Sequence, residues 1–197
     1  ALSARPFQAV AICLLNAYAN PDHERVVADL VRARFPTLHV SCSHEISREF
    51  REYERASTTA LSAYVQPIID SYLGRFEARL AREGFGGRFS IMQSNGGRLP
   101  AGAIRRNAIT ALFSGPAAGV MGAIRQVGAS DFHDLVTFDM GGTSTDVCLV
   151  SGGTPIIAPE TRVDGLPIRT PVVDIASVGA GGGSIVWRDT GGMLRVG

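Results

Sequence analysis

The stretch VTFDMGGTSTDVCLV, residues 136–150, decides the fold. Two short apolar runs flank a turn that contains two glycines, a serine and two threonines, and one aspartate stands at each end of this turn, Asp139 and Asp146. Apolar runs of this length around a glycine-containing turn predict two strands joined as a hairpin. The hairpin is either a surface turn with polar residues or a phosphate site, and the spacing alone favours neither interpretation.

A phosphate site needs several backbone N–H groups that point to one place without side chains in the way. Gly141 and Gly142 allow this close approach and permit a positive φ. Further hydrogen-bond donors are available from the hydroxyl groups of Thr143, Ser144 and Thr145. Two carboxylates fit beside an anion if a magnesium ion lies between them, because Mg²⁺ prefers carboxylate, water and phosphate oxygens. On this interpretation Asp139 and Asp146 are the metal-binding residues.

The first part of the chain, residues 1–107, alternates between strand and helix patterns. Short apolar runs predict strands at 8–15, 38–43 and 89–94. A helix is predicted after Asn20, which can serve as the N-cap, and a longer one over 57–82. Pro67 is expected to kink the longer helix or to divide it in two.

The remainder, residues 108–197, is rich in glycine and dominated by strand patterns. Strands are predicted at 108–113, 135–139, 145–150, 155–158 and 168–178, with a last hairpin formed by 184–187 and 193–196. One helix rich in small residues is predicted at 114–128, and its glycines and alanines favour close packing over an anion site. The two parts together predict an α/β protein with a boundary between residues 107 and 108.

Two further glycine-containing segments are candidates for a binding site. Gly181, Gly182 and Gly183 form either a second phosphate loop or a tight crossover where chain segments pack closely. The polar turn after the strand at 89–94 can line a substrate cleft, although hairpin chemistry explains it equally well. Its candidate residues are Ser94, Asn95 and Gly96.

The charged and sulfur-containing residues favour structural roles. The run SREFREYERAS at 47–57 predicts a salt-bridged helix surface, with Arg55 in a cleft as the less favoured alternative. The three cysteines are widely spaced and predict reduced, buried side chains in a cytoplasmic protein. No histidine spacing indicates a metal site, and no nucleophilic triad is identified, so the catalytic residues stay unassigned.

The balance of charge and the length of the apolar runs exclude several partners. The chain has 197 residues, with 19 basic and 18 acidic side chains and a net charge of +1, so we expect no binding to nucleic acid. No apolar run approaches the roughly 20 residues of a membrane span, so we expect no membrane partner. The absence of an initiating Met indicates a piece of a longer protein.

The motifs, taken in order, resemble those of a known family. An Asp-x-Gly-Gly-Thr-x-x-Asp sequence after an apolar strand resembles the phosphate motif of the actin-like ATPase superfamily. The order of the segments is similar to that of the hydantoinase A / 5-oxoprolinase family (N-methylhydantoinase A-like). These segments are NPDHE (20–24), EFREYERASTTALSAY (49–64), MQSNGG (92–97), FSGPAAGVMGA (113–123), FDMGGTSTDV (138–147) and VGAGGGSI (178–185).

The resemblance implies part of an actin-like (ribonuclease H-like) ATPase fold, with a mixed sheet and flanking helices. It also implies an ATP- and Mg²⁺-dependent enzyme that opens a small cyclic amide such as a hydantoin or 5-oxoproline, together with a second hydantoinase-type subunit or domain. In that picture the residues from Gly141 to Thr143 hold a phosphate, Asp139 organises Mg²⁺, and Asp146 positions the ion or an attacking group. The alternatives are an ATP-dependent ketone carboxylase subunit of the same family and a nucleotide-gated, chaperone-like module without catalysis.

One departure from the family pattern limits the expected activity. The family carries another Asp-x-Gly-Gly-Thr motif near its N-terminus, which supplies the opposite wall of the nucleotide cleft, and none precedes Asp139 here. We therefore expect these 197 residues to provide half of an ATP site in the central part of the protein. Alone they are expected to have little or no hydrolase activity.

Overall fold

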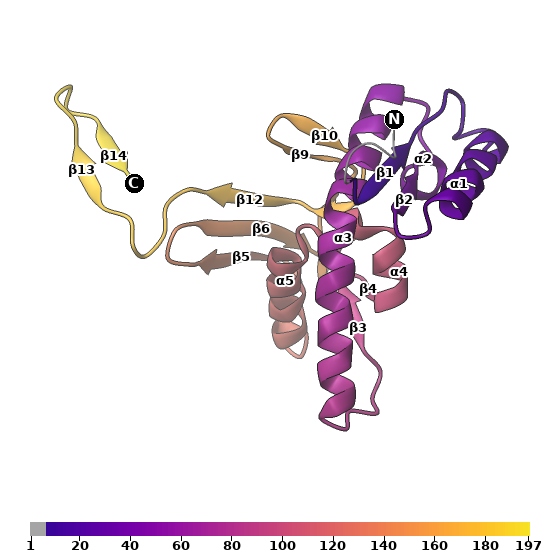
Figure 1. Ribbon diagram of the computed structural model, residues 1–197. Helices are drawn as coiled ribbons and strands as arrows, with labels where there is room; N and C mark the ends of the chain where they lie inside the picture. The colour runs from indigo at the N-terminus through magenta and orange to yellow at the C-terminus, as the bar shows by residue number, and fades with distance from the viewer. Residues whose placement is uncertain (1–6) are drawn as a thin grey trace. The chain divides into compact units, whose positions relative to one another are not determined.

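The computed structural model describes residues 7–197, which form two compact units (Figure 1). The first unit contains residues 7–93, 97–112 and 159–171, and the second contains residues 94–96, 113–158 and 172–197. The chain therefore enters and leaves each unit more than once, and the stretch 159–171 returns to the first unit after a long excursion. The boundary predicted from the sequence lies between residues 107 and 108, whereas the longest stretch of the second unit begins at Phe113.

The first unit combines helices with short strands. A parallel pair is formed by β1 (Ala9–Ile12) and β2 (His39–Cys42), which are connected through α1 (Asp22–Arg34). The other elements of this unit are α2 (Ser43–Ile46), α3 (Glu52–Arg82), β3 (Ser90–Met92), β4 (Arg98–Pro100), α4 (Ala101–Arg106), the 3₁₀ helix η2 (Ala108–Ala111), β9 (Thr161–Val163) and β10 (Leu166–Ile168). Strands β3 and β4 form one antiparallel hairpin, and β9 and β10 form another.

Helix α1 begins at Asp22, one residue later than its sequence signals predict, because the N-cap position is occupied by Pro21 and not by Asn20. The Asn20 side chain accepts a hydrogen bond from the backbone N–H of Asp22 at 3.0 Å, and helical residues follow directly. Acidic residues in the first turn and basic residues in the last turn complement the helix dipole. The buried face of α1 contributes Ala28 to a cluster with Ile12 and Val40 of the strand pair, so the helix is held by its packing on β1 and β2.

Helix α3 is longer than the sequence predicted and is not divided. It starts at Glu52 rather than at residue 57 and passes through Pro67 as one helix. Its buried face packs against β1, β2, η2 and β10. These contacts explain why the missing N–H of proline does not end the helix, because tertiary packing supplies most of the stability of helices in proteins.

The strand predicted at 108–113 is wrong, because residues Ala108–Ala111 form η2. A short apolar run without alternation does not distinguish a buried strand from a buried helical turn. Ile109 is fully buried in a cluster with Ile46 and Ile168, which come from α2 and β10. The apolar run is therefore explained by burial among elements that are distant in the sequence.

The second unit is built around one antiparallel sheet. Its strand order is β12-β6-β5, and β7 pairs with the end of β6. The elements of this unit are α5 (Ser114–Val127), β5 (Leu135–Met140), β6 (Thr145–Ser151), β7 (Thr154–Pro155), β8 (Ile157–Ala158), β11 (Val172–Val173), β12 (Ile175–Val178), β13 (Val186–Arg188) and β14 (Leu194–Val196). The last two form the predicted terminal hairpin.

The strand predicted at 168–178 is three strands instead of one. The segment is interrupted at Thr170 and Pro171, so that β10 ends at Ile168 and the next strands are β11 and β12. Proline lacks the N–H group that a continuous ladder requires, which explains the break. The core of the second unit lies between the sheet and α5, where Ala117 and Val120 pack against Cys148 and Val150.

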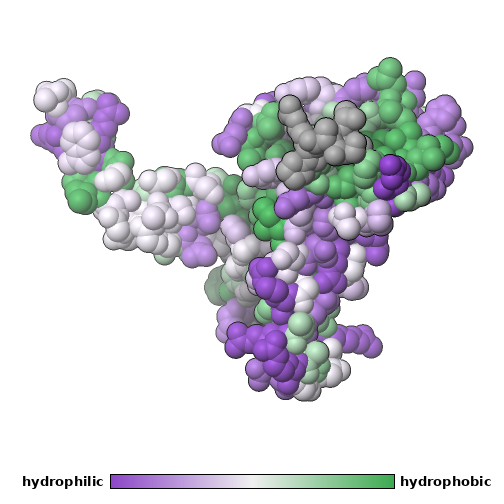
Figure 2. Space-filling model, in the orientation of Figure 1, coloured by the Kyte–Doolittle hydropathy of each residue, from purple (hydrophilic) through white to green (hydrophobic). Residues whose placement is uncertain are grey.

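Both units expose large apolar side chains. Figure 2 shows apolar residues gathered on the first unit in the region of β1 and α1, where Leu15, Val26 and Leu30 are exposed. In the second unit the strand residues Phe138 and Leu149 are also more than half exposed. Apolar patches of this kind are typical of surfaces that contact other protein segments. Over residues 7–197, no helix has the length and apolar character that a membrane crossing requires.

The three cysteines are free, as the sequence predicts; Cys42 and Cys148 are buried, whereas Cys13 is only half-buried, so the predicted burial is wrong for that residue. Burial raises the pKa of the Cys42 thiol to about 11, and burial also raises the pKa of the Cys148 thiol. The reactive form of cysteine is the thiolate. Neither side chain therefore has the properties of a nucleophile at neutral pH.

Cys42 is expected to resist alkylation in the folded protein. At pH 8 only a small fraction of a thiol with a pKa of about 11 is ionised, and the side chain is 1% exposed. Iodoacetamide labelling followed by peptide mass spectrometry should find Cys42 unmodified under native conditions and modified in urea. Equal labelling rates in the two conditions would contradict the burial described here.

Candidate functional site

The hairpin of β5 and β6 brings the two predicted aspartates together. Asp139 and Asp146 are direct cross-strand partners, and Asp146 is in turn paired with Ser177 of β12. Directly opposite residues of an antiparallel pair have their Cβ atoms about 4.5–5.5 Å apart and on the same face of the sheet. The Ser177 hydroxyl donates to Asp146 Oδ1 at 2.5 Å. The three side chains thus form one polar row across the sheet, next to the turn.

This polar row lies on the face of the sheet that α5 covers. A pocket of about 430 Å³ is lined there by Thr137, Asp139 and Asp146 from the hairpin and by Pro116 and Gly119 from α5, among others. A Cβ atom added to Gly119 would lie 3.6 Å from Asp139 Oδ2, so the helix passes close to this carboxylate. The small residues of α5 allow the close packing that the sequence predicts, and they also leave room at the carboxylates.

The facing carboxylates of Asp139 and Asp146 are a candidate cation site. Like charges directly opposite each other destabilise a sheet, and a cation between them removes the repulsion. Among residues 7–197, no group of three or more His, Cys, Asp or Glu side chains is arranged to hold a metal ion. A site with two carboxylates suits Mg²⁺, which keeps several waters and takes phosphate oxygens as further ligands. The residues present therefore fit a magnesium ion that arrives with a phosphate group.

The turn between the strands is closed by its own backbone. The N–H of Gly141 donates to the carbonyl of Ser144 at 2.9 Å. Neither Gly141 nor Gly142 has a positive φ, and a Cβ atom on either residue would meet no atom closer than 3.6 Å. The positive φ that glycine permits is thus not used at these two positions.

The steric need for glycine lies instead in the segment 179–184, which we call the glycine loop. A Cβ atom on Gly181 would lie 2.6 Å from the carbonyl oxygen of Gly141, and one on Gly183 would lie 3.0 Å from that of Gly142. The glycine loop therefore packs directly on the turn, as the crossover interpretation of its sequence predicts. Direct phosphate binding by Gly181, Gly182 and Gly183 stays a prediction.

The polar turn at 94–96 has structural contacts. Ser94 is buried, its hydroxyl accepts a hydrogen bond from the N–H of Phe113 at 3.1 Å, and its carbonyl accepts one from the N–H of Val173 at 2.8 Å. Gly96 has a φ of +82°, which a turn of this kind requires. None of Ser94, Asn95 and Gly96 lines the pocket at the carboxylates, and their predicted role in a substrate cleft stays a prediction.

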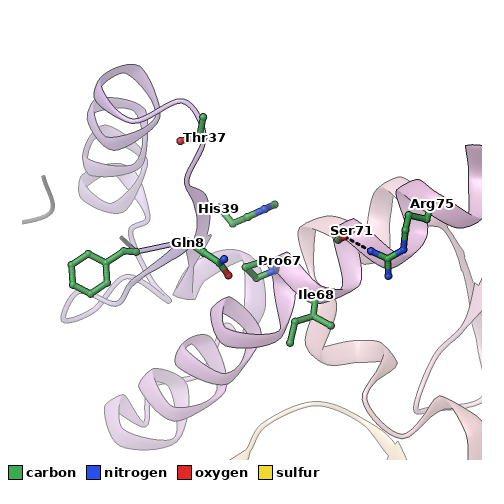
Figure 3. A pocket seen from close by; sticks show the side chains of 8 residues that line it. Gln8, Thr37, His39, Pro67, Ile68, Ser71 and Arg75 are labelled. Carbon is green, nitrogen blue, oxygen red and sulfur yellow. Dashed lines mark hydrogen bonds between the residues drawn. The ribbon is translucent and has the colours of Figure 1, made fainter. Parts of the chain in front are cut away.

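A second hollow lies within the first unit. It has a volume of about 610 Å³ and is lined by Gln8, which precedes β1, by His39 of β2 and by residues of α3 that include Pro67 and Ile68 (Figure 3). Arg75 donates to the Ser71 hydroxyl at 2.7 Å at its margin. It contains no carboxylate pair and none of the predicted site residues, so it lacks the chemistry of the hairpin pocket.

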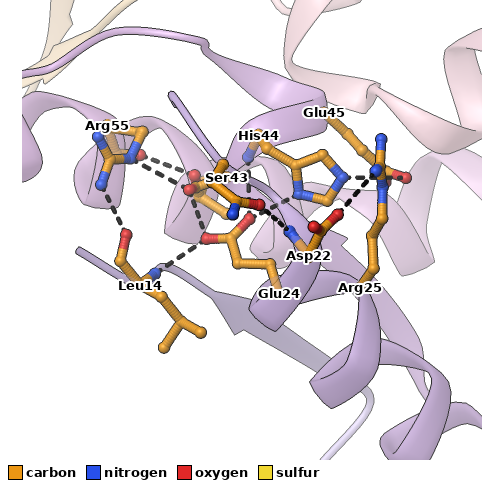
Figure 4. Close-up of polar contacts among 10 residues, drawn as sticks. Leu14, Asp22, Glu24, Arg25, Ser43, His44, Glu45 and Arg55 are labelled. Carbon is orange, nitrogen blue, oxygen red and sulfur yellow. Dashed lines mark hydrogen bonds and ion pairs between the residues drawn. The ribbon is translucent and has the colours of Figure 1, made fainter. Parts of the chain in front are cut away.

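The first unit also contains a buried polar cluster that sequence reasoning missed (Figure 4). The Glu24 side chain is fully buried and accepts hydrogen bonds from the Ser43 hydroxyl at 2.6 Å, from the N–H of Leu14 at 2.9 Å and from the N–H of His44 at 3.0 Å. His44 Nδ1 lies 2.7 Å from Glu24 Oε2, the same oxygen that accepts from the His44 N–H. Burial by itself raises the pKa of Glu24, but these hydrogen bonds outweigh it and lower the pKa below its usual value.

Arg55 completes this cluster, and the prediction that it lies on a helix surface is wrong. Its side chain is fully buried. Its guanidinium donates to the Ser43 hydroxyl at 3.1 Å and to the carbonyls of Glu49 and Leu14 at 2.6 and 2.8 Å. The adjacent Arg51 and Glu54 do form the predicted surface ion pair, at 3.5 Å. The cluster ties the turn after β1 to α2 and α3.

Comparison with known proteins identifies related chains across nearly the whole length. The sequence model described as hydantoinase/oxoprolinase matches residues 55–197. Caprolactamase subunit alpha of Pseudomonas jessenii is 36% identical over 190 residues, which are 96% of this chain and 27% of that protein. The 5-oxoprolinase of Saccharomyces cerevisiae is 36% identical over an alignment of 203 positions, which covers 100% of this chain and 15% of that enzyme. The chain thus spans less than a third of the length of these curated relatives.

Two solved structures share the fold. The crystal structure of the ATP-dependent caprolactamase from Pseudomonas jessenii matches 96% of this chain and 27% of its own, with a TM-score of 0.84 and 37% sequence identity. A nucleotide-free structure of acetone carboxylase, described with ATP-dependent acetone carboxylation, matches 96% of this chain and 27% of its own, with a TM-score of 0.72 and 28% identity.

Proposed function

We propose that this chain, which belongs to the hydantoinase/oxoprolinase family, forms one wall of the nucleotide site in an ATP-dependent enzyme that opens a cyclic amide. The names of two relatives, a caprolactamase and a 5-oxoprolinase, support a cyclic amide as the substrate class. The caprolactamase of known structure is described as ATP-dependent, which supports the use of ATP. Hydantoins, 5-oxoproline and caprolactam are the substrates to test first.

The observation that carries this proposal is the placement of Asp139 opposite Asp146 beside a glycine-containing turn. The carboxylates would hold Mg²⁺, and the Ser177 hydroxyl fixes the orientation of one of them. The N–H groups of Gly142 and Thr143 and the hydroxyl groups of Thr143 and Ser144 would receive the phosphate oxygens. The N–H of Gly141 and the hydroxyl of Thr145 already donate to backbone carbonyls. MgATP, when bound, supplies a phosphoryl group that can activate an amide oxygen for ring opening.

The chain's own residues provide positioning and electrostatic stabilisation rather than covalent chemistry. Carboxylates that hold a metal between phosphate oxygens stabilise the charge that develops during phosphoryl transfer. Asp139 and Asp146 stand on paired strands instead of a flexible loop, so their geometry is set before the nucleotide arrives. The residues that contact the cyclic amide are unassigned.

The facing wall of the nucleotide site would come from another domain or subunit. No Asp-x-Gly-Gly-Thr sequence precedes Asp139 in the 197 residues, so we propose that this chain alone has little hydrolase activity. The exposed apolar side chains on both units provide surfaces for such a partner. The name of one relative, a subunit alpha, also supports an assembly of more than one chain.

A ketone carboxylase is the second candidate function, because the acetone carboxylase structure matches 96% of the chain. The shared requirement is an ATP site, and the proposed site at the hairpin would serve either reaction. The two candidates differ in the second substrate, which is bicarbonate for a carboxylase and water for a hydrolase.

Substrate-stimulated ATP turnover tests the proposal. With the complete protein and any second subunit, phosphate release in the presence of Mg²⁺ is expected to rise at least about tenfold when hydantoin, 5-oxoproline or caprolactam is added. Stimulation that requires bicarbonate and a ketone would select the carboxylase instead. Stimulation by an unfolded protein client alone would indicate a chaperone-like module and contradict both enzymatic functions.

A further inference from the structure

The glycine loop is hydrogen-bonded to the turn through two parallel contacts. The N–H of Gly182 donates to the carbonyl of Gly141 at 2.9 Å, and the N–H of Gly183 donates to the carbonyl of Gly142 at 2.8 Å. The Thr145 hydroxyl donates to the carbonyl of Ala180 at 2.6 Å, which joins the loop to the start of β6. Three hydrogen bonds therefore connect the loop to both sides of the turn.

These contacts fix the direction in which the amides of the turn point. The carbonyl of residue 141 and the N–H of Gly142 belong to the same peptide unit, and in a planar trans peptide they point in opposite directions. The same holds for the carbonyl of residue 142 and the N–H of Thr143. Because the glycine loop holds both carbonyls, both N–H groups face away from it. Within residues 7–197 neither of these N–H groups has a protein acceptor.

The amides of the glycine loop itself are directed to protein atoms. The N–H of Gly181 donates to the Ser184 hydroxyl at 3.0 Å, and the N–H of Ser184 donates back to the carbonyl of Gly181 at 3.0 Å. The next two amides, of Gly182 and Gly183, are those that hold the turn. The N–H groups of Gly181, Gly182 and Gly183 therefore all donate to protein atoms in this structure.

We propose that the glycine loop is a positioning element, which aims the N–H groups of Gly142 and Thr143 at the phosphate of a bound nucleotide. Gly181 is its key residue, because the loop reaches the turn only without a side chain at that position. This inference rests on the proposed nucleotide site and adds to it the segment that sets the geometry of that site. N–H groups that are already in position do not have to reorient when charge develops on a phosphate group.

Substitution within the loop separates positioning from a general structural role. The change Gly181→Ala places a Cβ atom 2.6 Å from the backbone oxygen of Gly141 and 2.7 Å from the carbonyl carbon of Gly142, so loop and turn must move apart. The matched control is Gly179→Ala in the same loop, where a Cβ atom meets nothing within 4 Å. Both variants lose one glycine, and only the first displaces the turn.

The measurement is the dissociation constant for Mg-ADP, determined by calorimetry on the complete protein. Gly181→Ala is expected to weaken Mg-ADP binding by about tenfold or more, because displacements near 1 Å have effects of this size on aligned groups. Gly179→Ala should bind as the wild type does. The midpoint of thermal unfolding without ligand should be similar in all three proteins. If the loop had only a structural role, weaker binding in Gly181→Ala would be accompanied by a lower midpoint.

Each other outcome has a defined meaning. If the wild type does not bind Mg-ADP, the proposed nucleotide site itself is wrong. If the wild type binds and Gly181→Ala binds equally well, the positioning role is wrong while the nucleotide site stands. If Gly181→Ala fails to fold, the milder change Gly183→Ala decides, since its Cβ atom lies 3.0 Å from the oxygen of Gly142; unchanged affinity in that folded variant would overturn the inference.

Discussion

Replacement of Asp139 by asparagine is expected to lower MgATP-dependent turnover of the complete protein by at least about a hundredfold. The change keeps the size of the side chain and removes one of the two charges that face each other across β5 and β6. Loss of a single pre-positioned electrostatic group in an active site costs about 10²–10³ in rate. The measurement is steady-state phosphate release at saturating ATP and substrate, together with the circular dichroism spectrum as a test of folding.

The dependence on magnesium concentration refines this experiment. If Asp139 holds the ion, the Asp139→Asn protein should need more Mg²⁺ for half-maximal turnover than the wild type. If Asp139→Asn lost activity because it unfolded, added Mg²⁺ would not restore its turnover. A shift in the magnesium requirement therefore distinguishes a ligand from a residue that only supports the hairpin.

A matched control is available at the other end of the same hairpin. Asp134 is an exposed carboxylate that accepts hydrogen bonds from the N–H of Gly152 and the hydroxyl of Ser151, both at 2.8 Å. These contacts lower the pKa of Asp134 below its usual value. Asp134→Asn makes the same chemical change outside the pocket and should leave turnover nearly unchanged. Wild-type turnover in Asp139→Asn would mean that the hairpin is only a surface turn.

Replacement of Glu24 by alanine is expected to destabilise the first unit by about 3–5 kcal/mol, the range for breaking a buried charged interaction. The carboxylate accepts from Ser43, His44 and Leu14, and its removal leaves these donors buried without an acceptor. A loss of this size is a large share of the roughly 5–15 kcal/mol that stabilises a typical domain. The first unit should therefore open far more often than in the wild type.

Hydrogen exchange reports this opening locally. The N–H groups of Leu14 and His44 both donate to Glu24, so peptides that contain them should lose protection in Glu24→Ala. Where exchange requires opening of the unit, each decrease of about 1.4 kcal/mol in the free energy of opening makes hydrogen exchange tenfold faster. The control is Asp29→Ala in the same helix, because the Asp29 side chain is 79% exposed. Unchanged protection of the two peptides in Glu24→Ala would show that the cluster does not stabilise the unit.

The effect of Glu24 should also depend on pH, with a defined sign. Its pKa in the folded protein is lowered relative to the unfolded chain, because the hydrogen bonds outweigh burial. A carboxyl group of this kind contributes stability that is complete above its unfolded pKa and is lost as the pH falls through the folded value. The stability difference between wild type and Glu24→Gln should thus be largest near neutral pH and shrink in acid.

The sequence predicted the β5–β6 hairpin correctly because the relevant spacing is local, whereas the binding role of its residues stays a prediction. Alternation along 135–150 defines both strands and therefore the register that sets Asp139 opposite Asp146. The family resemblance and the α/β class are confirmed by the family match and by the caprolactamase structure. The contact of Ser177 with Asp146 was not predicted, because the two residues are 31 positions apart in the sequence.

Errors arose where burial depends on distant partners. The run at 108–113 looks like a strand, and only its contact with Ile46 and Ile168 explains why it forms a 3₁₀ turn. Arg55 stands in a charged run that is typical of exposed helices, and its burial follows from acceptors on Leu14, Ser43 and Glu49. No local pattern reveals such partners, since a buried charge is identified only by what surrounds it.

The path of the chain also determines when the first unit can finish folding during synthesis. Ile168 is fully buried in the same cluster as Ile46 and Ile109, and the N–H of Arg169 donates to the Thr58 hydroxyl at 2.8 Å. Residues 159–171 leave the ribosome only after the β5–β6 hairpin has been made. The early helices must therefore wait for a segment more than one hundred residues downstream, with part of their apolar surface uncovered. A nascent chain halted before residue 159 is the species that chaperones would be expected to bind.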